Sequence, residues 1–252
     1  MGALAGHTGG SGPPLLLIHG TGLTWRTWLP VIPILESARE VYAIDLPGFG
    51  DSPPAERYDI AGLADGLEDH LDTRGIERIA VAGNSLGGWL ALELAARGRA
   101  SAVAAISPAG CWTPREREWT RRVVGGLARP KRPPDWAWKS APARRVLMSS
   151  AMVHGDRLPP EECRRYAAAY ADTPGFWPVV RDTFSEVFRG FHQVRCPVSV
   201  LFGAGDWVVV RRAGPRIARL IPGARHEVVP GCGHVPMVDD PEGIAARILA
   251  TC

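Results

Sequence analysis

Four short apolar runs, each followed by a turn that contains glycine, constrain the fold of this chain more than any other feature. They occupy residues 15–19 (LLLIH), 41–45 (VYAID), 79–82 (IAVA) and 198–202 (VSVLF), and residues 103–106 and 226–229 are weaker candidates. Apolar runs of this length without polar alternation are typical of strands that are buried on both faces. The sequence therefore predicts the strands of a largely buried sheet.

Helical periodicity lies between these runs. Residues 60–73, 86–97 and 241–250 repeat apolar side chains at helical spacing, and Asp240 is a candidate cap before the helix that opens at Pro241. Strands that alternate with helices indicate an α/β fold, a mostly parallel, twisted sheet flanked by helices.

The strand signal disappears over residues 111–190. Four helix-like stretches follow one another there, separated by prolines, and five of the nine tryptophans fall within this range. We interpret residues 111–190 as a helical insertion in a core formed by residues 1–110 and 191–252.

Composition excludes several classes of protein. The chain has 252 residues, a formal net charge of +3 and five irregularly spaced cysteines, which predicts free thiols, no metal site and no nucleic-acid partner. No apolar run approaches the ~18 residues that cross a bilayer. No secretory signal is readable at the N-terminus. We expect a cytoplasmic protein that acts on a small molecule, and the oligomeric state cannot be read from the sequence.

The segment GNSLGG, residues 83–88, carries the strongest chemical signal. It lies between a predicted strand and a predicted helix, where flanking glycines permit a tight turn that exposes the serine above the sheet. The helix N-terminus at this point favours negative charge. Ser85 is therefore a candidate nucleophile, and the alternative is a serine that only caps the helix.

A serine nucleophile requires a general base that is oriented by an acid. Asp206 follows the strand at 198–202, and His234 follows the strand candidate at 226–229. Both residues should therefore lie at the sheet edge where open parallel sheets bind ligands. Asp206 could instead be a turn residue. His226 is the rival base, but it begins a strand and lacks a glycine-rich loop.

The developing oxyanion needs hydrogen-bond donors, and backbone N–H groups are already fixed in place. The N–H of Leu86, directly after the candidate nucleophile, is one donor that we expect, and the N–H of Thr21 is the other. The alternative for the Thr21 loop is a plain strand-to-helix turn. His19 is expected to hold this loop by hydrogen bonding.

Five motifs together resemble the α/β-hydrolase superfamily, from about Pro13 to Ala250. They are His19-Gly20, the segment DLPGFGDS at 45–52, GNSLG at 83–87, GAGD at 203–206 and Gly233-His234. The resemblance implies a Ser85–His234–Asp206 triad, a four-helix lid at 111–190, and structural roles for Asp45 and Asp51. Family members usually begin with two antiparallel strands, and we expect this sheet to lack the first one or both.

The resemblance also implies a reaction. We predict a serine hydrolase that cleaves a carboxylic ester, lactone or thioester through an acyl-enzyme, with no cofactor. The serine argues against the family's dehalogenases and epoxide hydrolases, which use aspartate at this position. The candidate substrate contacts are Gly22, Trp25, Trp112, Trp138, Trp177 and Trp207, although the lid tryptophans could equally be lid core.

Two alternatives to ester hydrolysis remain open. The first is hydrolysis of a carbon–carbon bond in a diketone, since such enzymes share the G-N-S-x-G-G segment. They typically show Gly-Pro-Gly after His-Gly, however, where this chain has Thr21-Gly22-Leu23. The second is a cyclase, a lyase or a binding protein that uses the same fold without hydrolysis.

Overall fold

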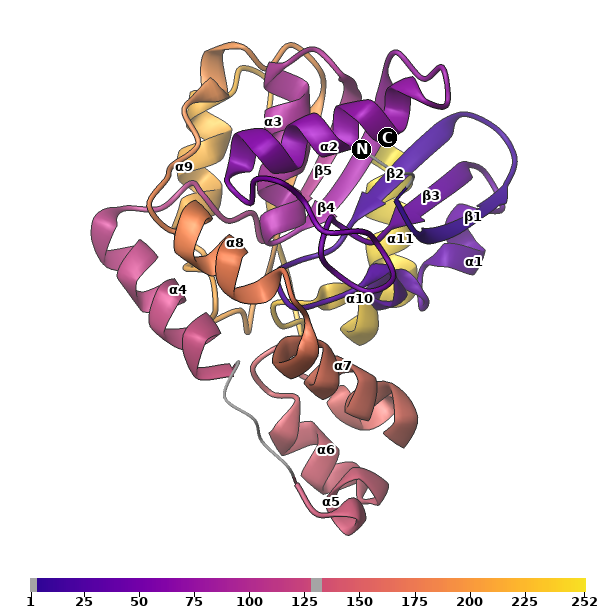
Figure 1. Ribbon diagram of the computed structural model, residues 1–252, viewed down its shortest axis with the longest axis vertical. Helices are drawn as coiled ribbons and strands as arrows, with labels where there is room; N and C mark the ends of the chain where they lie inside the picture. Colours follow the sequence, from indigo (N-terminus) through magenta and orange to yellow (C-terminus); the bar gives the residue numbers. More distant parts are fainter. Residues whose placement is uncertain (1–3, 128–132) are drawn as a thin grey trace.

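A seven-stranded sheet forms the centre of the molecule, as the computed structural model shows for the residues that it describes, 4–127 and 133–252 (Figure 1). The strands are β1 (Gly6–Gly10), β2 (Pro14–Ile18), β3 (Glu40–Ile44), β4 (Ile79–Asn84), β5 (Ala100–Ile106), β6 (Val198–Gly203) and β7 (Arg225–Val229). Their order is β1-β3-β2-β4-β5-β6-β7, and every pair is parallel except β1 with β3. The predicted α/β class and mostly parallel sheet are confirmed.

Strand β1 is the part of the sheet that the sequence did not predict. Its sequence is GHTGG, and its side chains alternate between exposed and half-buried. It pairs with β3 from Gly6 opposite Ile44 to Gly10 opposite Glu40. Because backbone hydrogen bonds hold this edge strand, it carries no apolar pattern. One antiparallel N-terminal strand is therefore present, where we expected one or both to be missing.

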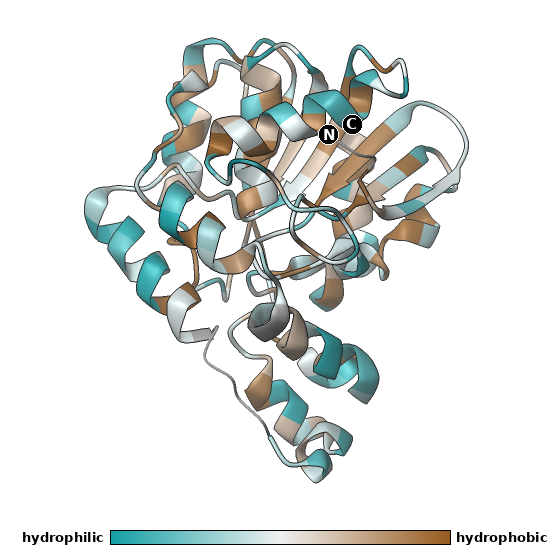
Figure 2. Cartoon of the chain, viewed as in Figure 1, coloured by the Kyte–Doolittle hydropathy of each residue, from teal (hydrophilic) through white to brown (hydrophobic). Residues whose placement is uncertain are grey.

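Each face of the sheet packs on its own set of helices. Leu16 and Ile18 of β2 point into the core shared with α2 (Ile60–Asp72), α3 (Leu86–Ala96) and α9 (Ala213–Leu220). Leu15 and Leu17 point to the opposite face, onto α1 (Ile32–Leu35) and α11 (Pro241–Thr251). Burial of each such side chain contributes roughly 1.5–3 kcal/mol. Figure 2 shows the same arrangement as apolar strands behind more polar outer helices.

The three helices predicted from periodicity, at 60–73, 86–97 and 241–250, correspond to α2, α3 and α11. The Asp240 side chain accepts a hydrogen bond from the N–H of Gly243 at 3.0 Å, which confirms the predicted cap. A short helix, α10 (Pro236–Asp239), and a 3-10 turn, η1 (Trp25–Trp28), complete the loops around the carboxyl edge of the sheet.

The chain between β5 and β6, which we call the β5–β6 segment (residues 107–197), is helical. In the described residues it contains α4 (Pro114–Leu127), α5 (Asp135–Lys139), α6 (Ala141–Leu147), α7 (Pro160–Asp172) and α8 (Phe176–Thr183), with turns η2 (Gly155–Arg157) and η3 (Gly190–His192). The predicted four stretches are thus five helices, because Ser140 leaves helical geometry and caps α6. Figure 1 shows α4 to α8 gathered on one side of the sheet. Within the described parts, no helix is both long and apolar enough to span a bilayer.

A buried histidine in α2 makes stability depend on pH. His70 is 3% exposed, and its Nδ1 accepts a hydrogen bond from the N–H of Leu4 at 3.3 Å. Burial, together with the nearby Arg74 charge, lowers the pKa of His70 to about 4. Between pH 6.5 and about 4, the unfolded chain binds a proton that the folded chain does not.

We therefore expect the free energy of unfolding to fall as the pH falls, because the unfolded chain gains a proton on His70 that the folded chain does not. Between pH 7 and about pH 5 this residue should remove about 2 kcal/mol from the free energy of unfolding. The His70→Asn variant keeps an acceptor but cannot titrate, so the stability gap between native and variant protein should narrow over this range. Urea unfolding at the two pH values measures the gap. A gap that stays constant would show that His70 does not cause the loss.

Candidate active site

Ser85 occupies a strained turn between β4 and α3. Its backbone has φ 57° and ψ −114°, a region that side-chain-bearing residues rarely adopt. The Ser85 N–H donates to the carbonyl of Ile106 at 2.9 Å, which fixes the turn to the neighbouring strand. A Cβ on Gly83 would lie 2.1 Å from the Gly87 carbonyl oxygen, and one on Gly87 would lie 2.1 Å from that of Ile18. The glycines are thus required by close backbone contact at this turn.

Asp206 and His234 form a buried pair. The His234 Nδ1 lies 3.0 Å from the Asp206 Oδ2, and the histidine and aspartate side chains are 6% and 0% exposed. The other carboxylate oxygen of Asp206 accepts from the N–H groups of Val208 and Val209 at 2.9 and 3.2 Å. These bonds fix the carboxylate so that one oxygen remains for the imidazole. The rival base, His226, lies elsewhere, on β7, with its ring against Gly214 of α9.

Asn84 connects the loop that carries His234 to the turn that contains Ser85. Its Nδ2 donates to the carbonyl of His234 at 2.9 Å and to that of Ile106 at 3.3 Å. The backbone of His234 is therefore held against the residue that precedes Ser85. In the described parts of the chain, the Ser85 hydroxyl has no hydrogen-bond partner, so the direct contacts are Asp206 with His234 and Asn84 with His234.

The loop after β2 lies beside Ser85. A Cβ on Gly20 would lie 3.0 Å from the Cβ of Ser85, so the loop that contains Thr21 passes directly over the serine. Leu86, the first residue of α3, is 2% exposed. Gly22 has φ +75°, and its Cα faces the ring of Tyr170 in α7, which a Cβ would approach to 2.6 Å. Gly20 and Leu86 thus border the serine turn, whereas Gly22 lies against α7.

His19 holds this loop in place, as its position predicted. Its Nδ1 lies 2.8 Å from the carbonyl of Gly20, and the N–H of Leu46 donates to its Nε2 at 2.9 Å. Burial lowers the pKa of His19 and so favours the neutral ring that both bonds require. Asp45 acts on the same region, because its carboxylate accepts from the N–H groups of Trp25 at 2.7 Å and Asp51 at 3.1 Å.

The tryptophans predicted to contact substrate fall into two groups. Trp112 and Trp138 are buried, at 8% and 6% exposure, and Trp112 stacks on Phe184. Trp177 and Trp207 are exposed. The Trp207 Nε1 donates to the carbonyl of Ser149 at 3.2 Å, so its indole bridges the loop after Asp206 and the end of α6.

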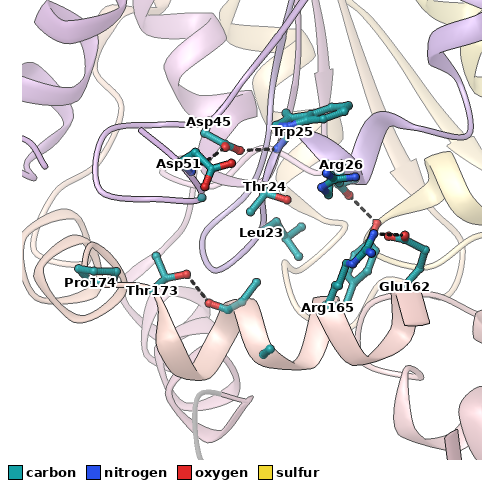
Figure 3. A pocket seen from close by; sticks show the side chains of 15 residues that line it. Leu23, Thr24, Trp25, Arg26, Asp45, Asp51, Glu162, Arg165, Thr173 and Pro174 are labelled. Carbon is teal, nitrogen blue, oxygen red and sulfur yellow. Dashed lines mark hydrogen bonds and ion pairs between the residues drawn. The ribbon is translucent and has the colours of Figure 1, made fainter. Parts of the chain in front are cut away.

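Trp25 lines a cavity of about 320 Å³ (Figure 3). The core side of this cavity consists of residues 23–27 and the Asp45 and Asp51 turn, and α7 closes the other side with residues that include Tyr166. The Tyr166 hydroxyl lies 2.8 Å from the Oγ1 of Thr27. The lining contains neither Ser85, Asp206 nor His234, so the candidate catalytic residues do not form the walls of this cavity.

The β5–β6 segment is hydrogen-bonded to the loop that holds Asp206. In α4, the Trp119 Nε1 donates to the Trp207 carbonyl at 2.8 Å, and the Thr120 hydroxyl donates to the Val208 carbonyl at 2.9 Å. The sequence analysis considered Trp119 only together with the other tryptophans of residues 111–190, and it assigned no role to Thr120, Asn84, Tyr166 or Tyr170. The two tyrosines lie four residues apart on α7, a spacing that places them on one helix face and could have indicated a shared contact.

Within the described residues, no three His, Cys, Asp or Glu side chains are arranged to hold a metal ion. The groups that the site does offer are a hydroxyl, an imidazole, a carboxylate and backbone N–H donors. Such a set can perform acyl transfer through a serine ester.

Comparison with known proteins places this arrangement in a family. The model of the Alpha/beta hydrolase family matches residues 15–247, and the chain belongs to this family. The protein named "Putative carbamate hydrolase RutD" from Shigella flexneri is 29% identical over 257 residues, which cover 94% of this chain and 90% of that protein.

Two solved structures show the same fold. A membrane phospholipase A, described as a bacterial virulence factor, is 28% identical with a TM-score of 0.79, and the match covers 96% of this chain and 80% of that one. The 2-hydroxy-6-oxo-6-phenylhexa-2,4-dienoate hydrolase from Rhodococcus sp. strain RHA1 has a TM-score of 0.78 at 22% identity, with 96% and 92% covered.

Proposed function

We propose that this chain is a serine hydrolase that cleaves a carboxylic ester, lactone or thioester of a small, largely apolar substrate. The observation that carries the proposal is the strained Ser85 turn joined through Asn84 to the loop of His234, whose imidazole contacts Asp206. A serine that only capped α3 would not need φ 57°, and its side chain makes no capping hydrogen bond.

In the proposed reaction, the Ser85 Oγ attacks the substrate carbonyl carbon while the His234 Nε2 takes the hydroxyl proton. Asp206 holds the ring through Nδ1 and stabilises the imidazolium that forms. The N–H groups of Leu86 and Thr21 donate to the developing oxyanion. The tetrahedral intermediate collapses, the leaving group takes the proton from His234, and Ser85 carries the acyl group.

Water then resolves the acyl-enzyme. The water oxygen attacks the acyl carbon while His234 removes a proton from the water. His234 then gives that proton to the Ser85 oxygen when the ester bond breaks. The products are a carboxylic acid and the leaving group, and the enzyme returns to its starting state. No cofactor takes part in this cycle.

The core of residues 1–110 and 191–252 would hold the triad, and the helical insertion at 111–190 would act as the lid that selects the substrate. The contacts of Trp119 and Thr120 with the Asp206 loop, and of Tyr166 with Thr27, support this role, because they seat the helices over the catalytic loops. Trp177 and Trp207, which are exposed, and Trp25, which lines the cavity, are the proposed aromatic contacts that a substrate can reach without opening the core. We expect the protein to act in the cytoplasm.

A substrate panel tests the reaction class. Purified protein is incubated with a short-chain p-nitrophenyl ester, an aryl carbamate and a 1,5-diketone, and product is followed by absorbance. We expect fastest turnover of the ester, with slower turnover of the carbamate as the relative's name suggests. Turnover of the diketone alone would replace the proposal by carbon–carbon bond hydrolysis. Folded protein that turns over none of the three would favour a binding role.

A further inference from the structure

Asp239, the last residue of α10, is a buried carboxylate with an unusual set of partners. It is 4% exposed, and its oxygens accept from the N–H groups of Gly233 at 2.7 Å, Val153 at 3.0 Å and His154 at 2.6 Å. Arg157 donates to the Asp239 backbone carbonyl instead of the carboxylate. Across residues 4–127 and 133–252 the carboxylate has no ion-pair partner, and its hydrogen-bond donors are backbone N–H groups.

The three donors belong to two different parts of the molecule. Gly233 immediately precedes His234, whereas Val153 and His154 lie in the β5–β6 segment between α6 and η2. A single oxygen, Oδ2, accepts from both Gly233 and Val153, and Oδ1 accepts from His154. The position of the β5–β6 segment is therefore linked through one atom to the backbone beside the base.

A second hydrogen bond joins the same two parts of the molecule at the residue that follows His234. The Val235 N–H donates to the Ala151 carbonyl at 2.7 Å. A Cβ on Gly233 would lie 2.9 Å from the Cα of Met152, so the two backbones are in direct contact. The residues on both sides of His234 are thus bound to residues 151–154.

We propose that Asp239 is a positioning residue for His234, and that it couples the seating of the β5–β6 segment to the orientation of the base. The inference rests on the proposed function, in which His234 must move a proton between Ser85 and the leaving group. Asp206 fixes the imidazole, but the backbone that carries it is held by Asn84, Ala151 and Asp239. A displacement of about 1 Å at a reacting group can cost on the order of 10²-fold in rate.

The test compares Asp239→Ala and Asp239→Asn with Asp59→Asn. Asp59 is a matched control, because its carboxylate also accepts a backbone N–H, from Gly62 at the start of α2, and no described contact joins it to the candidate site. Reactive sites are counted by complete reaction with a fluorophosphonate, so that kcat refers only to protein that folds. Ester kcat and KM are then measured on the same preparations.

We expect Asp239→Ala to lower kcat per reactive site by about 10- to 100-fold, with KM changed by less than about threefold. Asp239→Asn should fall between this variant and the native protein, because its one remaining oxygen can still accept from Gly233 and Val153. Asp59→Asn should keep the native kcat. A kcat per site within about twofold of native in Asp239→Ala would overturn the proposal, even if the melting temperature falls.

Hydrogen exchange measures the coupling without any substrate. In Asp239→Ala, exchange should accelerate in two separate peptides, one that contains Val153 and His154 and one that contains Gly233 and Val235. Acceleration confined to the first peptide would show that the two parts are not coupled through Asp239. Because this readout does not use catalysis, it distinguishes failure of the coupling from failure of the proposed hydrolase function, which Ser85→Ala tests.

Discussion

The Ser85→Ala variant should lose ester turnover by on the order of 10⁵-fold or more, while its fold is retained. The substitution removes the atom that forms the acyl bond, and the remaining N–H donors can supply only a small residual rate. Alanine lacks the hydroxyl but keeps the Cβ and the backbone. The strained turn therefore keeps its close approach to Gly20 and its N–H bond to the carbonyl of Ile106. Steady-state kinetics on purified protein measure the loss, and near-ultraviolet circular dichroism verifies the fold.

Ser107 provides a matched control for this variant. It follows the neighbouring strand β5, has a positive φ of 48°, and carries a buried hydroxyl without a hydrogen-bond partner in the described residues. Ser107→Ala should therefore keep turnover within about threefold of native, because no buried partner is left unpaired. If Ser85→Ala and Ser107→Ala lose activity equally, the loss comes from a change in the geometry of the turns after β4 and β5, and not from removal of the Ser85 hydroxyl. If Ser85→Ala keeps full activity, the proposed mechanism is wrong.

The Gly83→Ala variant should fail to reach the native fold in good yield. Its new Cβ would lie 2.1 Å from the carbonyl oxygen and 2.3 Å from the carbonyl carbon of Gly87, in the first turn of α3. Backbone atoms at this position cannot move without displacing Ser85, so we expect a cost of at least about 3 kcal/mol in the free energy of unfolding. For a chain of this size that corresponds to a fall in melting temperature of about 10 °C.

Gly125→Ala is the control for the glycine substitution. Gly125 lies in α4, and no heavy atom lies within 4 Å of its potential Cβ. Alanine there should raise the free energy of unfolding by up to about 1 kcal/mol, since glycine is the poorer helix former. Thermal unfolding of the two variants should therefore shift in opposite directions. Equal melting temperatures for Gly83→Ala and the native protein would contradict the close packing of the Ser85 turn.

The central sheet could be predicted because strands that are buried on both faces have a recognisable sequence pattern. Strands β2, β4 and β6 are continuous apolar runs, and their residues are almost all buried. Strand β1 has no such pattern, because its glycine-rich backbone pairs with β3 and its side chains stay partly in solvent. The division of α5 from α6 was missed for a similar reason, since a single residue, Ser140, produces it.

The candidate site was predictable where a loop follows a strand. Ser85, Asp206 and His234 each follow a strand in glycine-containing segments, and the carboxyl ends of neighbouring parallel strands meet at one edge. The buried environment of Trp112 and Trp138 was not predictable, because aromatic composition does not distinguish core from pocket. Asp239 was also hidden, since its partners are backbone N–H groups that every residue type other than proline carries.

The most direct test of the account is the position of a covalent adduct. The native protein is reacted with a fluorophosphonate, the intact mass is measured, and the modified residue is located by peptide mass spectrometry. We predict one adduct per chain, attached to Ser85, with much slower labelling in His234→Ala. An adduct on another residue, or no adduct on correctly folded protein, would contradict the assignment of Ser85 as the nucleophile.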